Sequence, residues 1–166
     1  MKEVKTVPKT EYTIEPGKQE LVSTVVIDAP RELVYRAYTD PKLFARWWGP
    51  RRYENHVEKF DIRFGGAWRV IQRGDDGAEY AFRGVTHEAV APERLCQTFE
   101  FEGVPGHIAL QTATFEDLGD KTRIRAQILF QSVMDRDGMV ASGMQSGADE
   151  SMERLQELLD SVKSDK

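Results

Sequence analysis

Cysteine is almost missing from this sequence, because Cys96 is the single one among 166 residues. One cysteine excludes an internal disulfide and is typical of proteins in the reducing cytoplasm. No apolar run approaches the roughly 20 residues that a membrane-spanning helix needs. The first residues, 1–5, are not followed by the hydrophobic segment of a secretory signal. The sequence therefore predicts a cytoplasmic protein with no membrane partner.

An excess of basic charge is missing too. The 23 Lys and Arg residues are outnumbered by 28 Asp and Glu residues, which gives a net charge of −5. The field of an acidic protein repels nucleic acid and anionic membrane surfaces. The basic pair Arg51-Arg52 is too short to indicate nucleic-acid contact. We expect no nucleic-acid partner.

Signatures of metal binding and catalysis are also scarce. The three histidines, His56, His87 and His107, lack the short spacing of a metal-binding pair, although a zinc site assembled from separate strands stays open. Cys96 lies in a strand-like run, where a free cysteine is usually an inert core residue. The sequence shows no glycine-rich phosphate loop that opens a helix, and no general acid or base can be identified from spacing. We therefore predict no metal, no cofactor and no catalytic residue.

What the sequence does contain is typical of one globular domain. Hydrophobic residues make up 40% and charged residues 31%, a balance that separates folded proteins from disordered ones. Residues 1–19 are polar and are punctuated by Pro8, Pro16 and Gly17, so we interpret them as an N-terminal arm with a possible short strand near 12–14. Residues 20–166 are predicted to form a single domain.

Two short helices are predicted after a first strand over 20–28. Pro30 suits the first position of one helix, which begins at Ala29-Pro30. Asp40 is a good cap for the other, with Pro41 at its first position. Gly49-Pro50 then ends that helix directly after a pair of tryptophans.

Six more strands and one long helix complete the predicted order. The strands lie near 54–63, 67–73, 78–90, 94–102, 108–117 and 121–132. Short turns such as Gly65-Gly66 and Gly119-Asp120 separate them, and such short connections require antiparallel neighbours. The long helix covers 137–162. This order predicts an α+β fold, in which a seven-stranded antiparallel sheet curls around the terminal helix.

The apolar stripe of that last helix changes character along its length. The C-terminal half carries Leu155, Leu158 and Val162, which fill a core. The N-terminal half carries small or flexible side chains: Gly143, Met144, Gly147, Ala148, Ser151 and Met152. Glycine inside a helix costs roughly 0.5–1 kcal/mol relative to alanine, so two glycines need a reason. Either this half crosses another backbone closely, or it frays, or it roofs a cavity.

Charged residues in the strands and in the helix raise a separate question. An inward Arg63, Arg69 or Arg83 would need a partner or a ligand anion, because an unpaired buried charge is very costly. Strand alternation favours outward arginines. Glu150 and Arg154 are spaced to pair on the exposed face of the last helix.

Several runs of the sequence resemble one known family. The opening run from Asp28 to Pro41, the run Trp47-Trp48-Gly49-Pro50, and Asp61-Ile62-Arg63-Phe64-Gly65-Gly66 are similar to the activator of the heat-shock-protein-ninety ATPase. Gly84 followed by Pro92-Glu93-Arg94-Leu95 adds to the resemblance, which extends from about residue 21 to 159. Each motif consists of turn and packing residues, so their order and spacing carry the resemblance.

The resemblance implies the START-like, helix-grip fold of the SRPBCC superfamily. In that fold seven antiparallel strands grip a C-terminal helix, with two short helices between the first two strands and commonly a hydrophobic cavity inside. Members include lipid and hormone binders, cyclases and the co-chaperone domain, so the fold does not choose a function. Many relatives have Gly-Trp in the long helix, whereas this chain has the run Ser146–Met152 without a large aromatic, which would enlarge the cavity.

We predict a non-catalytic protein that binds a small hydrophobic molecule between sheet and helix. The expected ligand-binding residues are Trp47, Trp48, Phe60, Trp68, Tyr80, Phe82, Phe99, Met144, Gly147 and Met152, although many of the aromatics can be plain core. Polar groups that can orient a ligand are Tyr80, His87, Gln97 and Thr112. A chaperone or other protein partner, bound through an exposed Trp47-Trp48 patch and the acidic helix face, is the alternative. A cyclase-like enzyme ranks third, and both a monomer and a homodimer remain open.

Overall fold

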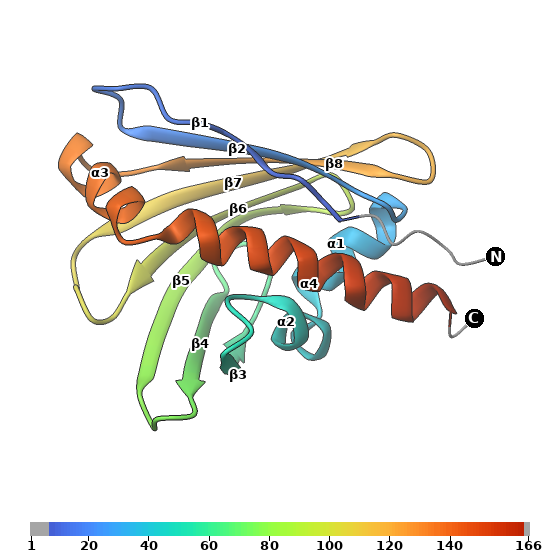
Figure 1. Ribbon diagram of the computed structural model, residues 1–166, viewed down its shortest axis with the longest axis horizontal. Helices are drawn as coiled ribbons and strands as arrows, with labels where there is room; N and C mark the ends of the chain where they lie inside the picture. Colours follow the sequence, from blue (N-terminus) through green and yellow to red (C-terminus); the bar gives the residue numbers. More distant parts are fainter. Residues whose placement is uncertain (1–6, 165–166) are drawn as a thin grey trace.

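An eight-stranded antiparallel sheet organises residues 7–164, which are the residues that this computed structural model describes. The strand order is β1-β2-β8-β7-β6-β5-β4-β3. The strands are β1 (Glu11–Thr13), β2 (Glu20–Ile27), β3 (Tyr53–Phe60), β4 (Ala67–Gly74), β5 (Glu79–Val90), β6 (Arg94–Phe101), β7 (Ile108–Asp117) and β8 (Thr122–Leu129). The sheet curves around a long C-terminal helix that lies across its inner side (Figure 1). The predicted α+β, helix-grip architecture is confirmed.

The predicted number of seven strands is wrong, because the N-terminal arm contributes an eighth. β1 pairs with β2, with Tyr12 opposite Ser23. The hydroxyl of Tyr12 donates to Asp149 Oδ1 at 2.7 Å on the C-terminal helix. The guanidinium of Arg136, which is 2% exposed, donates to the carbonyl oxygens of Glu15 at 2.5 Å and Glu20 at 3.2 Å. These bonds attach the arm to both layers.

The single helix predicted over 137–162 is also wrong. Two helices occupy this region, α3 (Val133–Ala141) and α4 (Met144–Ser164). The hydroxyl of Ser132 caps α3 by accepting from the backbone N–H of Asp135. Gly143 then adopts a φ of +87°, a left-handed conformation that ends the helix and starts a new direction. The break turns α3 away from the axis of α4 (Figure 1).

The two short helices, α1 (Arg31–Thr39) and α2 (Pro41–Trp47), lie between β2 and β3 as predicted. Asp40 caps α2 by accepting from the N–H of Lys42, and Gly49 ends it with a φ of +81°. One detail differs: Pro30 is the capping residue of α1 rather than its first helical residue.

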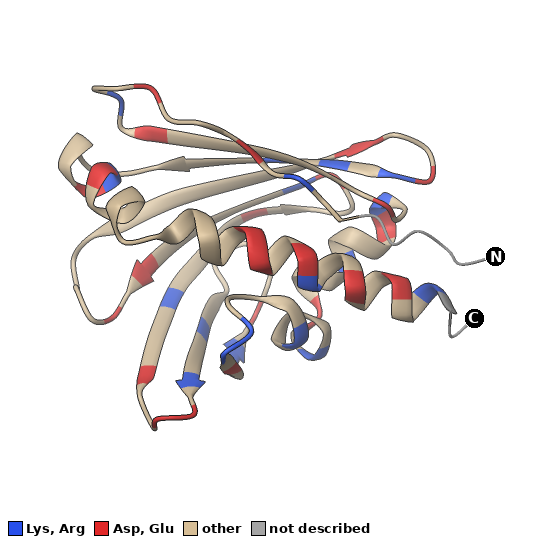
Figure 2. Ribbon diagram, in the orientation of Figure 1, with Lys and Arg blue, Asp and Glu red and all other residues tan. Residues whose placement is uncertain are grey.

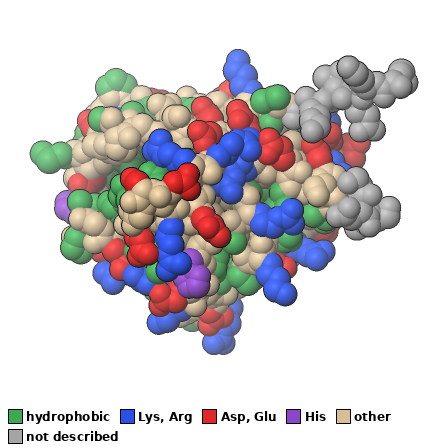
Figure 3. Space-filling view, turned by 60° about the horizontal axis from the view of Figure 1, so that its bottom comes forward, with side chains coloured by type: hydrophobic (Ala, Val, Ile, Leu, Met, Phe, Trp, Pro, Cys, Tyr) green, Lys and Arg blue, Asp and Glu red, His purple; other side chains and the backbone are tan. Residues whose placement is uncertain are grey.

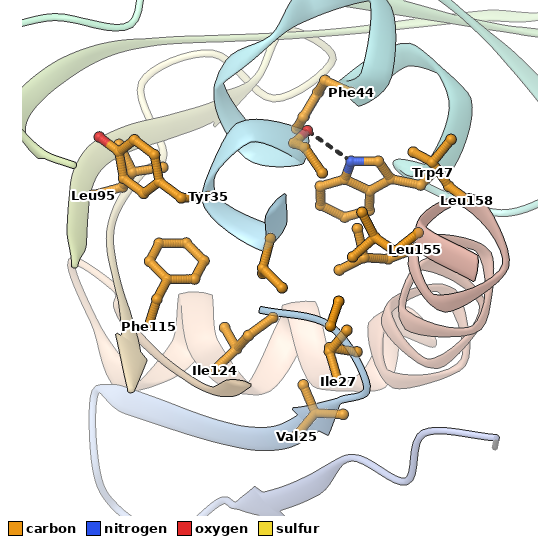
Figure 4. Close-up of a cluster of buried hydrophobic side chains, with 14 of the residues drawn as sticks. Val25, Ile27, Tyr35, Phe44, Trp47, Leu95, Phe115, Ile124, Leu155 and Leu158 are labelled. Carbon is orange, nitrogen blue, oxygen red and sulfur yellow. Dashed lines mark hydrogen bonds between the residues drawn. The ribbon is translucent and has the colours of Figure 1, made fainter. Parts of the chain in front are cut away.

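The packed core gathers where α1 and α2 meet the C-terminal half of α4 (Figure 4). Trp47 is 2% exposed, and its indole N–H donates to the carbonyl of Ala37 at 2.9 Å. The ring of Phe115 meets Tyr35 edge-on at 5.6 Å. Leu155 is fully buried beside these rings. The C-terminal half of α4 therefore packs into the core and fixes the helix against the sheet. The side chains of its N-terminal half determine how much space remains inside.

Lys and Arg are distributed among Asp and Glu over most elements (Figure 2), and side chains of both signs are interspersed on the molecular surface (Figure 3). The three arginines questioned above form ion pairs: Arg63, between β3 and β4, with Asp61 at 2.8 Å, Arg69 with Glu58 and Glu102, and Arg83 with Glu100 at 2.9 Å. Each of the three therefore has a carboxylate partner within the chain, and none of them lines either of the two cavities described below.

Arg154 does not form the surface pair with Glu150 that its spacing suggested. Its guanidinium donates to the carbonyl oxygens of Gly49 at 2.8 Å and Arg46 at 2.9 Å, which lie at the end of α2. Burial lowers the pKa of Arg154 below its ordinary value. A cation at a helix C-terminus satisfies carbonyls that the helix leaves free, so Arg154 fixes α2 against α4.

Candidate ligand-binding cavity

A cavity of about 500 Å³ lies between the sheet and the N-terminal half of α4, and we call it the inner chamber. Its floor includes Ser23, Ala126 and Ala113, which sit directly opposite one another on β2, β8 and β7. Its roof includes Gly147 and Ala148. Small side chains on both facing layers leave volume between them, and this is the physical origin of the chamber.

The surroundings of Gly143 and Gly147 distinguish between a close backbone crossing and the roof of a cavity. A Cβ placed on Gly147 would meet Pro50 at 3.5 Å, an ordinary contact distance, so no backbone crosses there closely. Gly143 is not inside a helix at all, since it forms the turn between α3 and α4. Gly147 therefore roofs a space, and Gly143 has a separate conformational reason.

Aromatic rings form one wall of the inner chamber. Trp48 meets Phe82 edge-on with ring centroids 5.2 Å apart, and Phe82 stacks on Phe99 at 5.5 Å. Phe44, on the side of the core, stacks on Trp48 at 5.4 Å. These mutual contacts fix the rings before any ligand arrives, and flat aromatic faces are favourable surfaces for an apolar molecule.

A second space of about 640 Å³ opens beside the chamber, between the ends of β4 to β7 and α3, and we call it the outer groove. Tyr80, Phe101, Val104, Ile108 and Met134 line it, and Met134 is 81% exposed. The groove and the chamber share lining residues: Gln72, Phe82, Phe99, Ala109, Phe130, Met139 and Ser142. The two spaces are therefore neighbours along one apolar tract.

Two polar contacts hold α3 over the outer groove. His107 Nδ1 lies 3.0 Å from Asp135 Oδ1 in the first turn of α3. The backbone N–H of Ile108 donates to Gln131 Oε1 at 3.2 Å, just before that helix. The position of α3 thus depends on the start of β7.

The predicted ligand-binding residues divide between these places. Trp47, Trp48, Met144, Gly147 and Met152 line the inner chamber, Tyr80 lines the outer groove, and Phe82 and Phe99 line both. Phe60 and Trp68 line neither and pack in the core.

The two core aromatics have evident neighbours. Phe60 packs on Phe44 with centroids 4.9 Å apart. Trp68 lies across from Gly84, where its buried indole N–H has no partner among the described residues. An exposed Trp47-Trp48 patch is excluded as well, because Trp47 is buried and Trp48 is half-buried in the aromatic wall.

The predicted polar groups are also divided. Gln97 and Thr112 line the inner chamber, whereas His87 is exposed and lines neither space. Sequence reasoning missed Gln72, Gln111, Phe130 and Met139 as lining residues. Alternation along β7 places Gln111 on the same face as the buried Ala109 and Phe115, so that signal was present for Gln111.

Neither a metal cluster nor a spanning helix is found within residues 7–164. No group of three or more His, Cys, Asp or Glu side chains in this range is placed to hold a metal ion. No helix in the same range is both long and apolar enough to cross a membrane. Cys96 is half-buried and accepts a long contact from the hydroxyl of Thr112 at 3.6 Å.

Solved structures of other proteins share this architecture. A protein from Arthrobacter aurescens matches with a TM-score of 0.84 at 23% identity over 91% of each chain. A protein from Rhodobacter sphaeroides matches with 0.83 at 21% identity, over 93% of this chain and 99% of that one. DynU16, a protein in the dynemicin biosynthetic locus, matches with 0.67 at 22% identity, over 86% of this chain and 48% of that one. These likenesses show the fold.

Sequence comparison identifies the family. No curated protein matches the chain significantly. The family described as "Activator of Hsp90 ATPase homolog 1-like protein" matches residues 28–160, which include α1, α2, the strands β3 to β8, α3 and most of α4. With four-fifths of its length matched in the expected order, this chain belongs to the Activator of Hsp90 ATPase homolog 1-like family, of START-like, helix-grip fold.

Proposed function

We propose that this protein binds a small, mainly hydrophobic molecule in the inner chamber, with room for the molecule to extend into the outer groove. The observation that carries the proposal is the facing pair of small-residue surfaces, which leaves about 500 Å³ between sheet and helix. Ligand sites in proteins typically occupy about 300–1,000 Å³ and are lined mostly by apolar groups.

The apolar lining supplies the driving force for binding. Burial of a ligand's apolar surface contributes about 25 cal/mol per Å² before the costs of association are subtracted. Val104 and Met134 are exposed apolar residues at the outer groove, on the loop before β7 and on α3. Their exposure supports entry of the ligand through the outer groove.

The test is a fluorescence titration with N-phenyl-1-naphthylamine, an uncharged apolar probe, together with native mass spectrometry of the purified protein. We expect saturable uptake of one probe molecule, and displacement of the probe by any molecule that co-purifies. If the probe shows only weak, non-saturable emission and the mass spectrum contains the bare chain alone, the proposal is wrong.

A protein partner remains the second candidate, and its support is the acidic face of α4 (Figure 2). Asp149 and Glu157 are exposed on this face, although Glu157 pairs with Arg51 at 2.7 Å. A chaperone ATPase assay with the purified protein checks this candidate; an unchanged rate and no binding would remove it. An enzyme of the cyclase kind needs a general acid or base, and Tyr38, Arg52 and Glu150 are the described chamber residues with ionisable side chains.

A further inference from the structure

The charged groups that border the inner chamber and the outer groove are few, and each has a partner. Among the described lining residues they are Arg52, Glu150 and Asp135, and the imidazole of His107 is the one further basic group. The guanidinium of Arg52 is exposed and stacks over the ring of Tyr53, 4.9 Å from its centroid. Glu150 Oε2 accepts from the backbone N–H of Arg51 at 2.8 Å. His107 and Asp135 pair with each other.

One part of the floor of the inner chamber carries a row of polar, uncharged side chains. Thr86, Gln97 and Gln111 stand directly opposite one another on β5, β6 and β7. The side-chain N–H of Gln97 donates to the hydroxyl of the fully buried Thr86 at 3.0 Å, which orients the amide of Gln97. Gln111, next in the row, also lines the chamber. Primary amides offer both donors and acceptors, so this row can bind a hydroxyl, a carbonyl or an N–H group.

From this arrangement we infer the class of ligand, an inference that rests on the proposed function: an uncharged, flat, largely aromatic molecule, with a hydrogen-bonding group seated on Gln97 and Gln111. A carboxylate or sulfonate in the chamber would lose its hydration and meet no opposite charge on the floor. The aromatic wall of Trp48, Phe82 and Phe99 favours a flat ring system. The chamber therefore discriminates against fatty acids and other organic anions.

Two probes that differ by one charged group test the inference. N-phenyl-1-naphthylamine is neutral, and 8-anilinonaphthalene-1-sulfonate carries the same rings with an added sulfonate. We expect the neutral probe to bind at least about tenfold more tightly, since the sulfonate must be desolvated without a counter-charge. Equal or tighter binding of the sulfonate in the same chamber would overturn the inference.

A charge placed on the floor should reverse this preference. Gln111→Lys puts an ammonium group beside the probe, so the affinity for the sulfonate should rise at least about tenfold relative to the neutral probe. Leu110→Lys is the matched control, because Leu110 is the preceding residue and points to the outer face, opposite Leu129. It adds the same charge outside the chamber. An equal gain in both variants would show that general attraction by the surface, and not the floor, selects the ligand.

A competition experiment tests the hydrogen bond between the ligand and the two glutamines. In competition with N-phenyl-1-naphthylamine, 1-naphthol should bind the wild-type protein more tightly than naphthalene does. Replacing the amide in Gln111→Leu should reduce that advantage by about threefold to tenfold, the range expected for one hydrogen bond. If 1-naphthol keeps its full affinity advantage over naphthalene in both Gln111→Leu and Gln97→Leu, the ligand does not form its hydrogen bond with these two residues.

The outcomes separate the inference from the proposed function. If neither naphthalene probe binds saturably, the proposed function and the inference both fail. If both bind and the sulfonate is preferred, a hydrophobic-ligand site remains, and only the uncharged class is wrong.

Discussion

The absence of a side chain at position 147 contributes to the volume of the inner chamber. Gly147 lines the roof, and a Cβ there would touch only Pro50 at 3.5 Å. Gly147→Leu adds a branched side chain in a cavity of about 500 Å³. We expect the affinity for N-phenyl-1-naphthylamine to fall at least about tenfold, because the ligand loses volume and aromatic contact. A fluorescence titration measures the change.

Gly147→Ala is the matched control for this prediction. A methyl group fits at the contact distance, and alanine is the better helix former, so urea unfolding should show a gain of about 0.5–1 kcal/mol. Its loss of probe affinity should be about threefold at most. If the leucine variant is folded and binds as tightly as the wild type, Gly147 does not border the binding site.

The same residue scale shows what sequence spacing can and cannot decide. Trp68 and Phe82, both expected to bind a ligand, do pack on the core side of the sheet. Spacing could not say that Trp68 packs over Gly84 while Phe82 reaches the chamber, because that depends on which neighbour across the sheet is small. Aromatic content alone therefore overestimated the ligand wall by two residues, Phe60 and Trp68.

At the scale of elements, the turn between α3 and α4 depends on Gly143. Its φ of +87° lies in the left-handed region, which costs an L-residue roughly 1–2 kcal/mol. Gly143→Ala should lower the free energy of unfolding by about that amount. Gly138→Ala, inside α3 where no atom lies within 4 Å of an added Cβ, should be neutral or stabilising. Urea unfolding of both variants makes the comparison, and equal effects would contradict the role of Gly143.

This turn also explains why one long helix was predicted. The helical spacing of small and apolar residues continues from Gly143 to Gly147 without interruption, and spacing carries no information about the sign of φ. The capping residue Ser132 and the turn residue Gly143 were the available signals. At α2 no helical spacing continues past the capping residues Asp40 and Gly49, and both ends of that helix were predicted correctly.

The connection between β6 and β7 borders the outer groove and is held by Glu100. Its carboxylate accepts from Arg83 Nε at 2.9 Å and from the N–H of Gly106 at 2.6 Å. These bonds, the one from Arg83 first, lower the pKa of Glu100 below its ordinary value of 4.5. Because the folded-state pKa is the lower one, this contribution to stability is present above pH 4.5 and is lost as the pH falls below it.

Urea unfolding between about pH 7 and pH 3 should therefore show a loss of stability that is smaller in Glu100→Gln. Glu116→Gln is the control, since Glu116 forms an exposed pair with Arg123 on the outer face. It should keep the wild-type dependence on pH. A Glu100→Gln variant with the full wild-type dependence would show that another carboxylate is responsible.

For the whole molecule, the two halves of α4 have different tasks. Leu155, Leu158 and Leu159 are buried against α1, α2 and the sheet, and this end holds the fold together. The other half faces small side chains and leaves the chamber. The sequence predicted this division because the sizes of the side chains along the helix can be read directly from it. It could not predict the outer groove, which forms where Val104, Ile108 and Met134 meet from three separate segments.

The arm is the part of the whole molecule whose role is most open to experiment. The predicted division into an arm over 1–19 and a domain over 20–166 can be tested by removing residues 1–19. Arg136 would lose its bond to the carbonyl of Glu15, α4 would lose the hydroxyl of Tyr12, and Thr10 would leave the lining of the chamber. Removing a partner of a buried charge and a side-chain hydrogen bond should lower stability by at least about 3 kcal/mol.

Removal of residues 1–9 is the matched control, because it keeps Thr10, β1 and both bonds. It should lose less stability and retain more affinity for N-phenyl-1-naphthylamine than the longer truncation. Thermal unfolding and the probe titration measure the two effects on the same samples. If the chain over 20–166 matches the longer one in both, the arm is separable and the eighth strand contributes nothing to the chamber. A loss of both thermal stability and probe affinity would make the arm part of the binding fold. In that case β1 stabilises the edge strand β2 by pairing with it, and Glu15 stabilises Arg136 by accepting its hydrogen bond.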